Sequence, residues 1–303
     1  MKFIPYQIPG KNINTPWGDI ASFLTGDEQN LDKSTVESFG SEWSKFDFFS
    51  EQEIQHVGDT YFDIVTDKHL QKETTRALDV GCGSGRWSYY LADKVHTLDC
   101  IDPSDAVFVA KKNLSKFKNT RVAKTSVEAM PFPNGSFDFV FSLGVLHHIP
   151  DTQAAMKNCV NKLKKGGFFL IYLYYNLDNR GWMFKLMLKI VTMARLTISK
   201  LPEKIKHIVC DLLAITIYMP FISLARLIKL VSKRSTAHQK IPLSYYIDKS
   251  FNVIRNDALD RFGTPLEQRF SKKEIKKMLE EAGIYNITFS KSEPYWHAIG
   301  EKK

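Results

Sequence analysis

The chain has 303 residues, 44% of them hydrophobic and 25% charged, and a formal net charge of +9. This is ordinary globular composition, and the length suits one large domain or a domain with a sizeable insertion. The four cysteines include no C-x-x-C pair, which argues against a zinc site or a disulfide framework, so we expect reduced thiols and no metal. Residues 1–18 lack a continuous apolar run, so we expect no signal peptide and a cytoplasmic protein.

The N-terminal segment, residues 1–70, divides into two parts. Residues 1–30 are rich in Pro, Gly and Asn and predict an irregular arm. Residues 36–49, VESFGSEWSKFDFF, are dense in aromatic residues. Their spacing fits an amphipathic helix that packs its aromatic stripe onto the rest of the fold. It fits equally a lid over a substrate, with Phe39 and Trp43 as contacts, and both interpretations stay open.

A glycine-rich loop follows the first apolar run of the chain. In ALDVGCGSGRW, residues 77–87, three glycines come directly after a run that predicts a buried strand. A dinucleotide-binding loop needs G-x-G-x-x-G/A, but the third position here is Arg86 or Ser88. A phosphate-binding P-loop needs Gly-Lys-Ser/Thr, which does not follow either. The loop therefore lacks phosphate-binding features, and taken alone it fits a tight turn without a ligand.

Residues 76–175 alternate apolar runs with segments of helical spacing, which predicts alternating strands and helices. We expect strands at 76–80, 95–102, 120–127, 137–146 and 166–175, and helices at 85–94, 103–117 and 151–164. This order predicts an α/β fold with an open, largely parallel sheet and helices on both faces. Such sheets bind ligands at the carboxyl ends of their strands, where the glycine loop lies.

Asp102 ends the second predicted strand, 17 residues after the last glycine of the loop. A carboxylate there can accept hydrogen bonds from both hydroxyls of a ribose. An Asp at such a position can also cap the next helix. We favour the ribose, because the glycine loop is adjacent.

Four motifs in this order resemble the class I S-adenosylmethionine-dependent methyltransferases, in particular the quinone and small-molecule subgroup. They are LDVGCGSG, IDPSD, VEAMPFPNGSFDFVFS and VLHHIPD, between residues 75 and 175. The resemblance implies a Rossmann-like fold with a mostly parallel, seven-stranded sheet, a cofactor-binding core over residues 71–178, and S-adenosylmethionine as cofactor. This cofactor has no phosphate but a sulfonium cation, which carboxylates and aromatic faces favour.

The resemblance also implies which residues contact the cofactor. They are Asp79, Gly81, Gly83 and Gly85 in the first loop, Asp102, Pro103 and Ser104 at the ribose, Val127 and Glu128 at the adenine, and Ser142 and Leu143 under the sulfonium. The sequence departs from the family at Ser126, where many relatives have an Asp that accepts from the adenine amine.

Two histidines, His147 and His148, follow the fourth predicted strand. Histidine titrates in the range that suits a general base, so either one can take a proton from the methyl acceptor. Both can instead be structural residues of the loop that starts the next helix. A base is needed only where the acceptor must lose a proton to react.

Residues 179–265 form an insertion with two long apolar segments. Between residues 180 and 240 there are 12 Lys and Arg but only two acidic residues, so all of the positive excess lies here. The uncharged run, residues 212–225, has 14 residues and contains Pro220, short of the roughly 20 needed to cross a bilayer. We expect a helical cap over the acceptor, or a cap that also touches an anionic membrane surface. Nucleic acid is not expected, because the basic residues are interleaved with aliphatic ones.

After the insertion, residues 266–303 predict the last helix and strands of the sheet, with Ser271 and Glu274 forming a capping box. Tyr245, Tyr246 and Arg269 are candidate acceptor contacts on a segment that can also be a plain connector. The sequence thus predicts a methyltransferase acting on a small, lipid-linked or glycan acceptor. The alternative is a non-catalytic protein that binds the cofactor or serves as a membrane scaffold.

Overall fold

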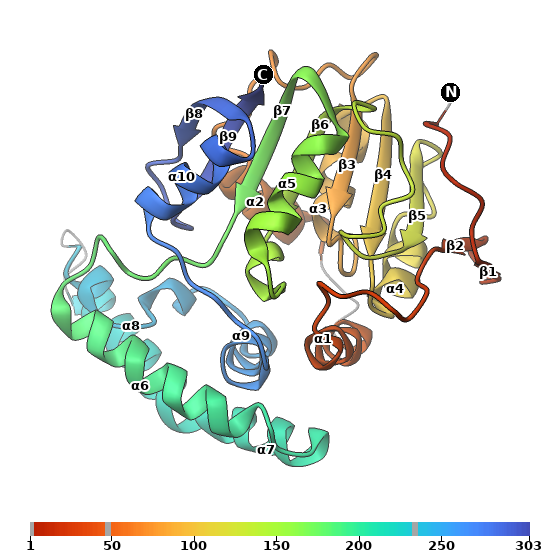
Figure 1. The fold of residues 1–303 in the computed structure, drawn as a ribbon. Coiled ribbons are helices and arrows are strands. Elements are labelled where there is room, and N and C mark those ends of the chain that lie inside the picture. Colours follow the sequence, from red (N-terminus) through yellow and green to blue (C-terminus); the bar gives the residue numbers. More distant parts are fainter. Residues whose placement is uncertain (1–2, 46–49, 232–235) are drawn as a thin grey trace. The chain divides into compact units, whose positions relative to one another are not determined.

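The computed structural model describes residues 3–45, 50–231 and 236–303. The chain divides into two compact units (Figure 1). The core unit consists of residues 1–181 and 266–303, and the helical unit consists of residues 182–265. The N-terminal 70 residues belong to the core unit and form no unit of their own.

The core unit is built on one mixed sheet, whose order in space is β1-β2-β5-β4-β3-β6-β7-β9-β8. Strands β3 to β7 are parallel to one another, and β9 runs antiparallel to both β7 and β8. The strands are β1 (Lys11–Ile13), β2 (Ile20–Ser22), β3 (Arg76–Val80), β4 (Thr97–Asp102), β5 (Thr120–Lys124), β6 (Phe137–Leu143), β7 (Leu163–Tyr172), β8 (Ile284–Phe289) and β9 (His297–Lys302).

The seven predicted strands are present, and a hairpin from the N-terminal arm extends the sheet by two more. The expectation of an irregular arm over residues 1–30 is wrong at this hairpin. Strand β2 pairs in parallel with β5, matching Ala21 with Ala123, and β1 pairs antiparallel with β2. Ile20 is completely buried. Three-residue strands are too short to show an alternating pattern, so the sequence gives little sign of them.

Helices cover both faces of the sheet. One face packs against α3 (Arg86–Leu91), α4 (Ala106–Asn113) and the end of α2 (Glu51–Tyr61), and the other against α5 (Thr152–Lys162) and α10 (Lys272–Glu281). Each face has its own hydrophobic cluster. In β6, Phe137 and Val140 belong to the cluster under α5 and α10, and Phe139 and Phe141 belong to the cluster under α3 and α4. The pairing of β6 with β7 shifts register after Phe137. The predicted capping box of Ser271 and Glu274 is confirmed at the start of α10.

The helical unit contains α6 (Trp182–Ile198), α7 (Glu203–Leu213), a π-helix η3 (Ala214–Tyr218), α8 (Met219–Val231) and α9 (Phe251–Gly263), with short 3₁₀ turns η4 (Ala237–Lys240) and η5 (Ser244–Tyr246). Its own hydrophobic cluster joins α9 to one face of the helix that α7, η3 and α8 form together. Tyr218 is the largest fully buried side chain of this cluster.

The prediction that no segment is long enough to cross a bilayer is wrong for the helical unit. Residues Glu203–Val231 form one continuous helix of 29 residues whose most apolar window has a mean hydropathy of 2.0. By length and composition this helix could cross a membrane, and only 28% of that window is buried in the protein. The uncharged run of residues 212–225 is shorter than the helix, which continues beyond the charged residues at both ends of the run and passes through Pro220.

The π-helix explains how the helix continues through Pro220. A proline has no N–H, and its ring clashes with the carbonyl four residues earlier, here that of Thr216. Thr216 lies inside η3, where the wider turn changes this geometry. The buried residues Cys210, Ala214, Tyr218 and Ile222 are spaced by four, which drifts around a regular α-helix by about 40° each time. The wider turn keeps them on one face.

Candidate functional site

The glycine loop joins β3 to α3 at the carboxyl end of the sheet. Gly81, Gly83 and Gly85 all have positive φ, at 80°, 52° and 80°. A Cβ on Gly81 would lie 2.4 Å from Cγ1 of Val145, so even alanine does not fit without movement. The backbone N–H groups of Gly81 and Cys82 both donate to the carbonyl of Ile101, which holds the loop against β4. The loop therefore needs glycine for both conformation and space.

Asp102, at the end of β4, is bonded directly to this loop. Its Oδ2 accepts from the Gly83 N–H at 2.9 Å, and its Oδ1 accepts from the N–H and hydroxyl of Ser104 at 2.8 and 2.6 Å. Burial raises the pKa of Asp102, and the hydrogen bonds from Ser104 and Gly83 oppose that rise. Each carboxylate oxygen has two lone pairs, so Oδ1 is fully used by Ser104 and Oδ2 can still accept one hydroxyl donor. Half-buried Pro103 lies between Asp102 and Ser104.

Asp79 places a second carboxyl group in the same region. Its Oδ2 accepts from the Ser88 hydroxyl at 2.6 Å, while its Oδ1 is buried and has no hydrogen-bond partner among the described residues. Burial raises its pKa to about 7, Ser88 opposes this, and the nearby charge of Asp102 adds to it. A bound cation would satisfy the second oxygen and stabilise the charged carboxylate. The two carboxyl groups therefore fit a cofactor that carries a positive charge.

The segment after β5 contains the predicted adenine contacts. Ser126 is buried, and its hydroxyl accepts from the Ala129 N–H at 3.1 Å, which leaves Val127 buried beside the turn. Glu128 is exposed, and its Oε2 accepts from the N–H groups of Gln29 and Asn30 at 3.0 and 2.9 Å. The carboxylate of Glu128 thus holds the N-terminal segment over this edge of the sheet, a contact the sequence did not indicate.

Ser142 and Leu143 end strand β6 next to β3. Ser142 is fully buried, and its hydroxyl donates to the Val80 carbonyl at 2.8 Å. This bond ties β6 to β3 just before the glycine loop. The Ser142 hydroxyl therefore bonds within the sheet, and Leu143 is the last residue of β6, at the carboxyl end of the sheet.

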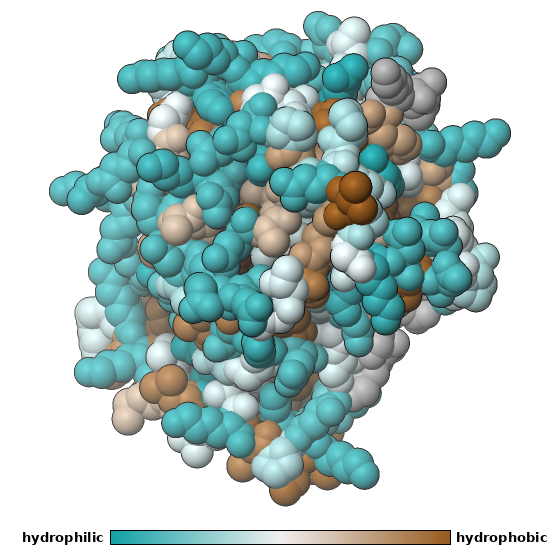
Figure 2. All heavy atoms as spheres, turned by 45° about the vertical axis from the view of Figure 1, so that its right-hand side comes forward, coloured by the Kyte–Doolittle hydropathy of each residue, from teal (hydrophilic) through white to brown (hydrophobic). Residues whose placement is uncertain are grey.

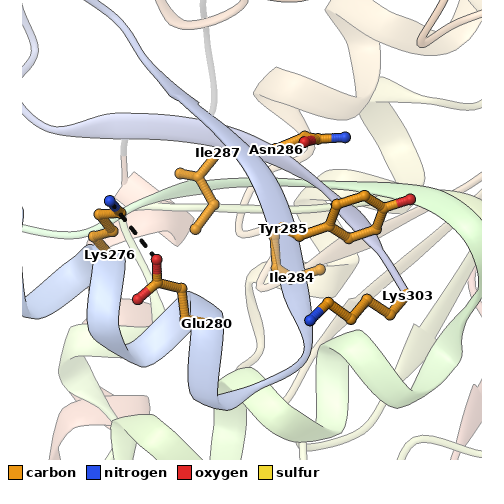
Figure 3. A pocket seen from close by; sticks show the side chains of 7 residues that line it. All are labelled: Lys276, Glu280, Ile284, Tyr285, Asn286, Ile287 and Lys303. Carbon is orange, nitrogen blue, oxygen red and sulfur yellow. Dashed lines mark ion pairs between the residues drawn. The ribbon is translucent and has the colours of Figure 1, made fainter.

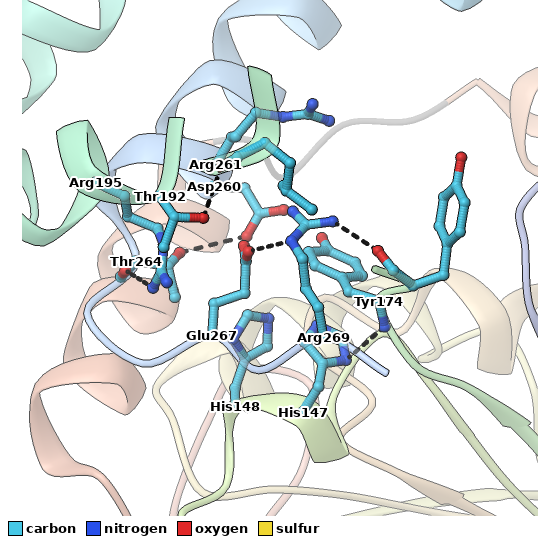
Figure 4. A network of polar contacts seen from close by, with 12 residues as sticks. His147, His148, Tyr174, Thr192, Arg195, Asp260, Arg261, Thr264, Glu267 and Arg269 are labelled. Carbon is cyan, nitrogen blue, oxygen red and sulfur yellow. Dashed lines mark hydrogen bonds and ion pairs between the residues drawn. The ribbon is translucent and has the colours of Figure 1, made fainter. Parts of the chain in front are cut away.

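The two histidines lie in the 3₁₀ turn η2 (Leu146–His148) and differ in their partners (Figure 4). His148 Nδ1 lies 2.7 Å from the carbonyl oxygen of Leu266, which can only accept, so the proton is on Nδ1 and the lone pair is on Nε2. His147 is fully buried, and its Nδ1 accepts from the Tyr174 N–H at 3.4 Å. Its ring stacks on Tyr174 at 3.9 Å. Burial moves the pKa of His147 well below its usual value, so this ring is neutral.

Arg269, a predicted acceptor contact, is engaged within the core unit. Its Nε donates to Oε1 of Glu267 at 2.8 Å and its Nη1 donates to the Tyr175 carbonyl at 3.2 Å. Its guanidinium carbon lies 5.2 Å from the centre of the Tyr174 ring. Figure 4 shows Glu267 and Arg269 beside the histidines. Glu267, whose side chain is almost fully buried, was not found from the sequence because an isolated Glu in a connector carries no signal.

Helix α1 (Lys33–Lys45) touches two parts of this site. The Phe39 ring meets the His148 ring edge-on, with centres 4.8 Å apart. A Cβ on Gly40 would lie 3.3 Å from the backbone nitrogen of Asp105, so α1 also approaches the loop after β4 closely. Trp43 belongs to α1, but its side chain and residues 46–49 lie outside the described part. The position of Phe39 fits both the packing and the lid interpretation.

Tyr245 and Tyr246 belong to the helical unit. Tyr246 is buried in its hydrophobic cluster, and its ring centre is 5.8 Å from that of Tyr218. Tyr245 is 54% exposed. The burial of Tyr246 argues for a packing role in place of the predicted acceptor contact.

A buried histidine bonded to a carboxylate, His297 with Asp63, was not predicted from the sequence. His297, at the start of β9, is fully buried, with Nε2 2.7 Å from Oδ1 of Asp63 and Nδ1 2.8 Å from the Pro294 carbonyl. The Ser290 hydroxyl donates to Oδ2 of Asp63 at 2.6 Å. These bonds fasten the end of α2 to the hairpin between β8 and β9, beside Tyr172 at the carboxyl end of β7.

A surface hollow of about 450 Å³ lies at the opposite end of the sheet (Figure 3). It is lined by α10 and the first half of β8, where Lys276 and Glu280 form an ion pair at 3.7 Å. Because β8 runs parallel to β7, residues 284–287 lie at the amino end of the sheet. The hollow is therefore separate from the glycine loop and the histidines.

Comparison with known proteins identifies the family. A family model described as "Methyltransferase domain" matches residues 78–171, from the glycine loop to the end of β7. This chain contains a class I S-adenosylmethionine-dependent methyltransferase domain. Its cofactor is S-adenosylmethionine, whose cationic sulfonium fits the pair of buried carboxyl groups Asp79 and Asp102.

Two curated relatives illustrate the similarity. The methyltransferase is 26% identical over 189 residues to the ubiquinone biosynthesis O-methyltransferase of Coxiella burnetii, covering 59% of this chain and 76% of that protein. It is 35% identical over 103 residues to phosphoethanolamine N-methyltransferase 2 of Caenorhabditis elegans, covering 32% of this chain and 23% of that protein. The crystal structure of YcgJ from Bacillus subtilis aligns with a TM-score of 0.47 at 15% identity, covering 77% of this chain and 70% of that chain.

Proposed function

We propose that this methyltransferase transfers the methyl group of S-adenosylmethionine to a small, lipid-linked acceptor, at the cytoplasmic surface of a membrane. The observation that carries the lipid-linked acceptor is the exposed apolar surface of the helical unit, which is interleaved with lysines. The names of the two relatives, which act in ubiquinone biosynthesis and on phosphoethanolamine, support a small acceptor. A glycan acceptor is the second candidate, since the positive charge of residues 180–240 would attract an acidic sugar.

The chain's own residues have three tasks in this reaction. When bound, the cofactor supplies an electrophilic methyl group on a sulfonium, which an acceptor nucleophile displaces directly. We assign the cofactor contacts to the glycine loop, Asp79 and Asp102, and the closing of the site to α1 through Phe39. Holding the nucleophile in line behind the methyl group is a proximity effect and needs no further catalyst.

We assign removal of the acceptor's proton to His148 and not to His147. The carbonyl of Leu266 fixes the proton of His148 on Nδ1, which leaves Nε2 able to accept one. His147 is fully buried, and its lowered pKa makes it a weak base. We assign His147 to positioning η2 through Tyr174, on which it stacks.

Release of S-adenosylhomocysteine from a panel of hydroxyl, amine and carbon acceptors, with and without lipid tails, tests this function. The Asp102→Ala variant should lose cofactor affinity in calorimetry. The His148→Ala variant should keep that affinity and lose turnover by about 10²-fold or more, as expected for a general base. Cofactor binding without turnover on any acceptor would favour the alternative, a non-catalytic binding or scaffold protein. Full activity of His148→Ala would leave positioning as the whole mechanism.

A further inference from the structure

The helical unit carries most of the large apolar side chains that the described part of the protein exposes. On α6 they follow helical spacing, with Trp182, Leu186, Ile190 and Met193 on one stripe. On the helix formed by α7, η3 and α8, the exposed apolar residues are Ile205, Ile208, Leu212, Ile215, Ile217, Phe221, Leu224, Leu227, Leu230 and Val231. Figure 2 shows such apolar residues among hydrophilic ones at the bottom of the view. Patches of this extent mark contact surfaces.

The opposite faces of these helices are already packed. Cys210, Ala214, Tyr218 and Ile222 are buried against α9, and both α6 and α7 contact α9. The exposed stripes therefore face away from α9. The stripe on α6 extends over roughly 17 Å and the stripe on the long helix over roughly 39 Å, since each residue adds about 1.5 Å. A soluble cap would present polar residues there.

The charges interleaved with the stripes are positive. Lys185, Lys189, Lys200 and Lys204 are exposed, and none of them forms an ion pair that the described residues show. The segment has only two acidic residues, and both have partners of their own. Asp211 forms a two-bond ion pair with Arg255 at 2.5 and 2.7 Å, and Glu203 lies 3.7 Å from Nε2 of His207. Apolar side chains ringed by lysines match the acyl layer and the headgroups of an anionic bilayer.

The packing of α9 decides how the long helix can lie in a bilayer. If residues 203–231 crossed the membrane, α9 would enter the hydrocarbon alongside, together with Arg255, Asp257 and Arg261. Charged groups at that depth are costly. If the helix lies in the plane of the interface, the stripe enters the acyl region and the charged side of α9 stays in water.

We propose that α6 and the helix of residues 203–231 form an in-plane anchor, whose apolar stripe inserts into one leaflet of an anionic membrane. The anchor rests on the proposed function only for its purpose, which is to bring the site to lipid-linked acceptors. It makes binding partly resistant to salt, because insertion of apolar side chains is not screened, whereas attraction by lysines is.

Flotation of the full chain with vesicles of phosphatidylcholine, with and without phosphatidylglycerol, tests the anchor. We expect binding to the anionic vesicles that persists in part at high salt. The Ile208→Gln, Ile215→Gln, Leu227→Gln triple variant should lower the binding constant about tenfold or more without changing charge. The Lys185→Gln, Lys189→Gln, Lys204→Gln variant should remove mainly the salt-sensitive part. The matched control is Ile8→Gln, which removes a 94% exposed apolar residue from the core unit and should leave binding unchanged.

The depth of the helix separates the in-plane from the crossing arrangement. An Ile217→Trp variant places a reporter at the middle of the helix. In-plane insertion predicts stronger quenching of its added fluorescence by bromine near the headgroup end of the acyl chain than at the chain end. Stronger quenching by chain-end bromine would overturn the in-plane arrangement.

Four further outcomes bear on the anchor. No flotation at low salt would refute it, and so would concentration-dependent dimerisation abolished by the triple variant, since a second copy would then cover the stripe. Cofactor affinity and turnover of a water-soluble acceptor should stay normal in the triple variant, which supports a separate anchoring role. If the wild type binds vesicles but methylates no acceptor, the proposed function fails and the anchor stands.

Discussion

We expect the charge state of Asp79 to depend on the cofactor. It is buried, one of its oxygens has no partner among the described residues, and its pKa of about 7 lies well above the ordinary value of 3.8. Because the pKa is raised in the folded protein, stability present below about pH 4 is lost as pH rises through about 7. A cationic cofactor needs the ionised form, so binding should release a proton at neutral pH and below.

We therefore predict that affinity for S-adenosylmethionine rises with pH up to about 7, as the Asp79 carboxyl ionises. Calorimetry in buffers with different heats of ionisation would measure both the affinity and the proton release. In the Asp79→Asn variant the affinity should be lower and its dependence on pH over this range should disappear. An unchanged pH profile in that variant would show that another group titrates.

Gly81 offers a second test at the residue scale. The Gly81→Ala variant adds the strain of a positive φ, about 1 kcal/mol or more, and a clash with Val145. We expect lower stability in urea unfolding and weaker cofactor binding. A Gly81→Ala, Val145→Gly double variant removes the clash but not the strain, so it should recover part of both losses. Full recovery would mean that the conformation of the loop does not matter.

The sequence motifs predicted which residues lie at the site, but they did not predict the hydrogen bonds that these residues form. The glycine loop and Asp102 were found because both sit at strand ends. The bonds from Gly83 to Asp102, from Ser88 to Asp79 and from residues 29–30 to Glu128 were not. Such bonds join segments far apart in the chain, and a single side chain at a turn gives no sign of its partner.

At the scale of elements, the π-helix η3 sets which face of the long helix is buried. Deleting Ile217, an exposed residue within η3, would favour a regular α-helix and rotate everything after it by about 100°. Ile222 would then leave the hydrophobic cluster, and Ala225 would lose its buried position. We predict that the deletion speeds hydrogen exchange in α8 and α9 and leaves cofactor affinity unchanged. Ile217→Ala is the matched control, because it keeps the length; equal exchange in both variants would contradict the role of the π-helix.

Strands and helices with a clear hydrophobic pattern could be predicted from the sequence. The short hairpin of β1 and β2 and the continuous helix through Pro220 could not. The strands from β3 to β7 are each five or more residues long and alternate with helical segments, so their places were clear, although β7 begins three residues earlier than expected, at Leu163. The hairpin of β1 and β2 is too short to show a pattern. Pro220 lies inside the apolar run, but the π-turn before it accommodates the ring, and the residues of that turn give no sign of it in the sequence.

For the whole molecule, the basic and apolar composition of residues 180–240 indicated an insertion, and the structure gives it a hydrophobic cluster of its own. The chain enters and leaves the helical unit at neighbouring points of the core unit. The N–H of Phe270 donates to Tyr174 and the N–H of Asn176 donates to Phe270, at 2.9 and 3.1 Å. Residues 175 and 270 thus run side by side, and the core sheet is completed by β9 on β7 without residues 182–265.

This arrangement predicts that the insertion can be removed. Replacing residues 182–265 by a short Gly-Ser linker should leave a folded core, because both of its hydrophobic clusters lie within the core unit and loop closure costs little extra for a modest linker. We expect the shortened protein to bind S-adenosylmethionine within a few-fold of the wild-type affinity and to gain thermal stability from it, as any ligand of the native state provides. It should lose flotation with anionic vesicles and turnover of lipid-linked acceptors. Circular dichroism, calorimetry and flotation measure these properties separately. If the shortened protein unfolds, the core unit depends on the helical unit; if it folds and still floats, the membrane contact lies in the core unit.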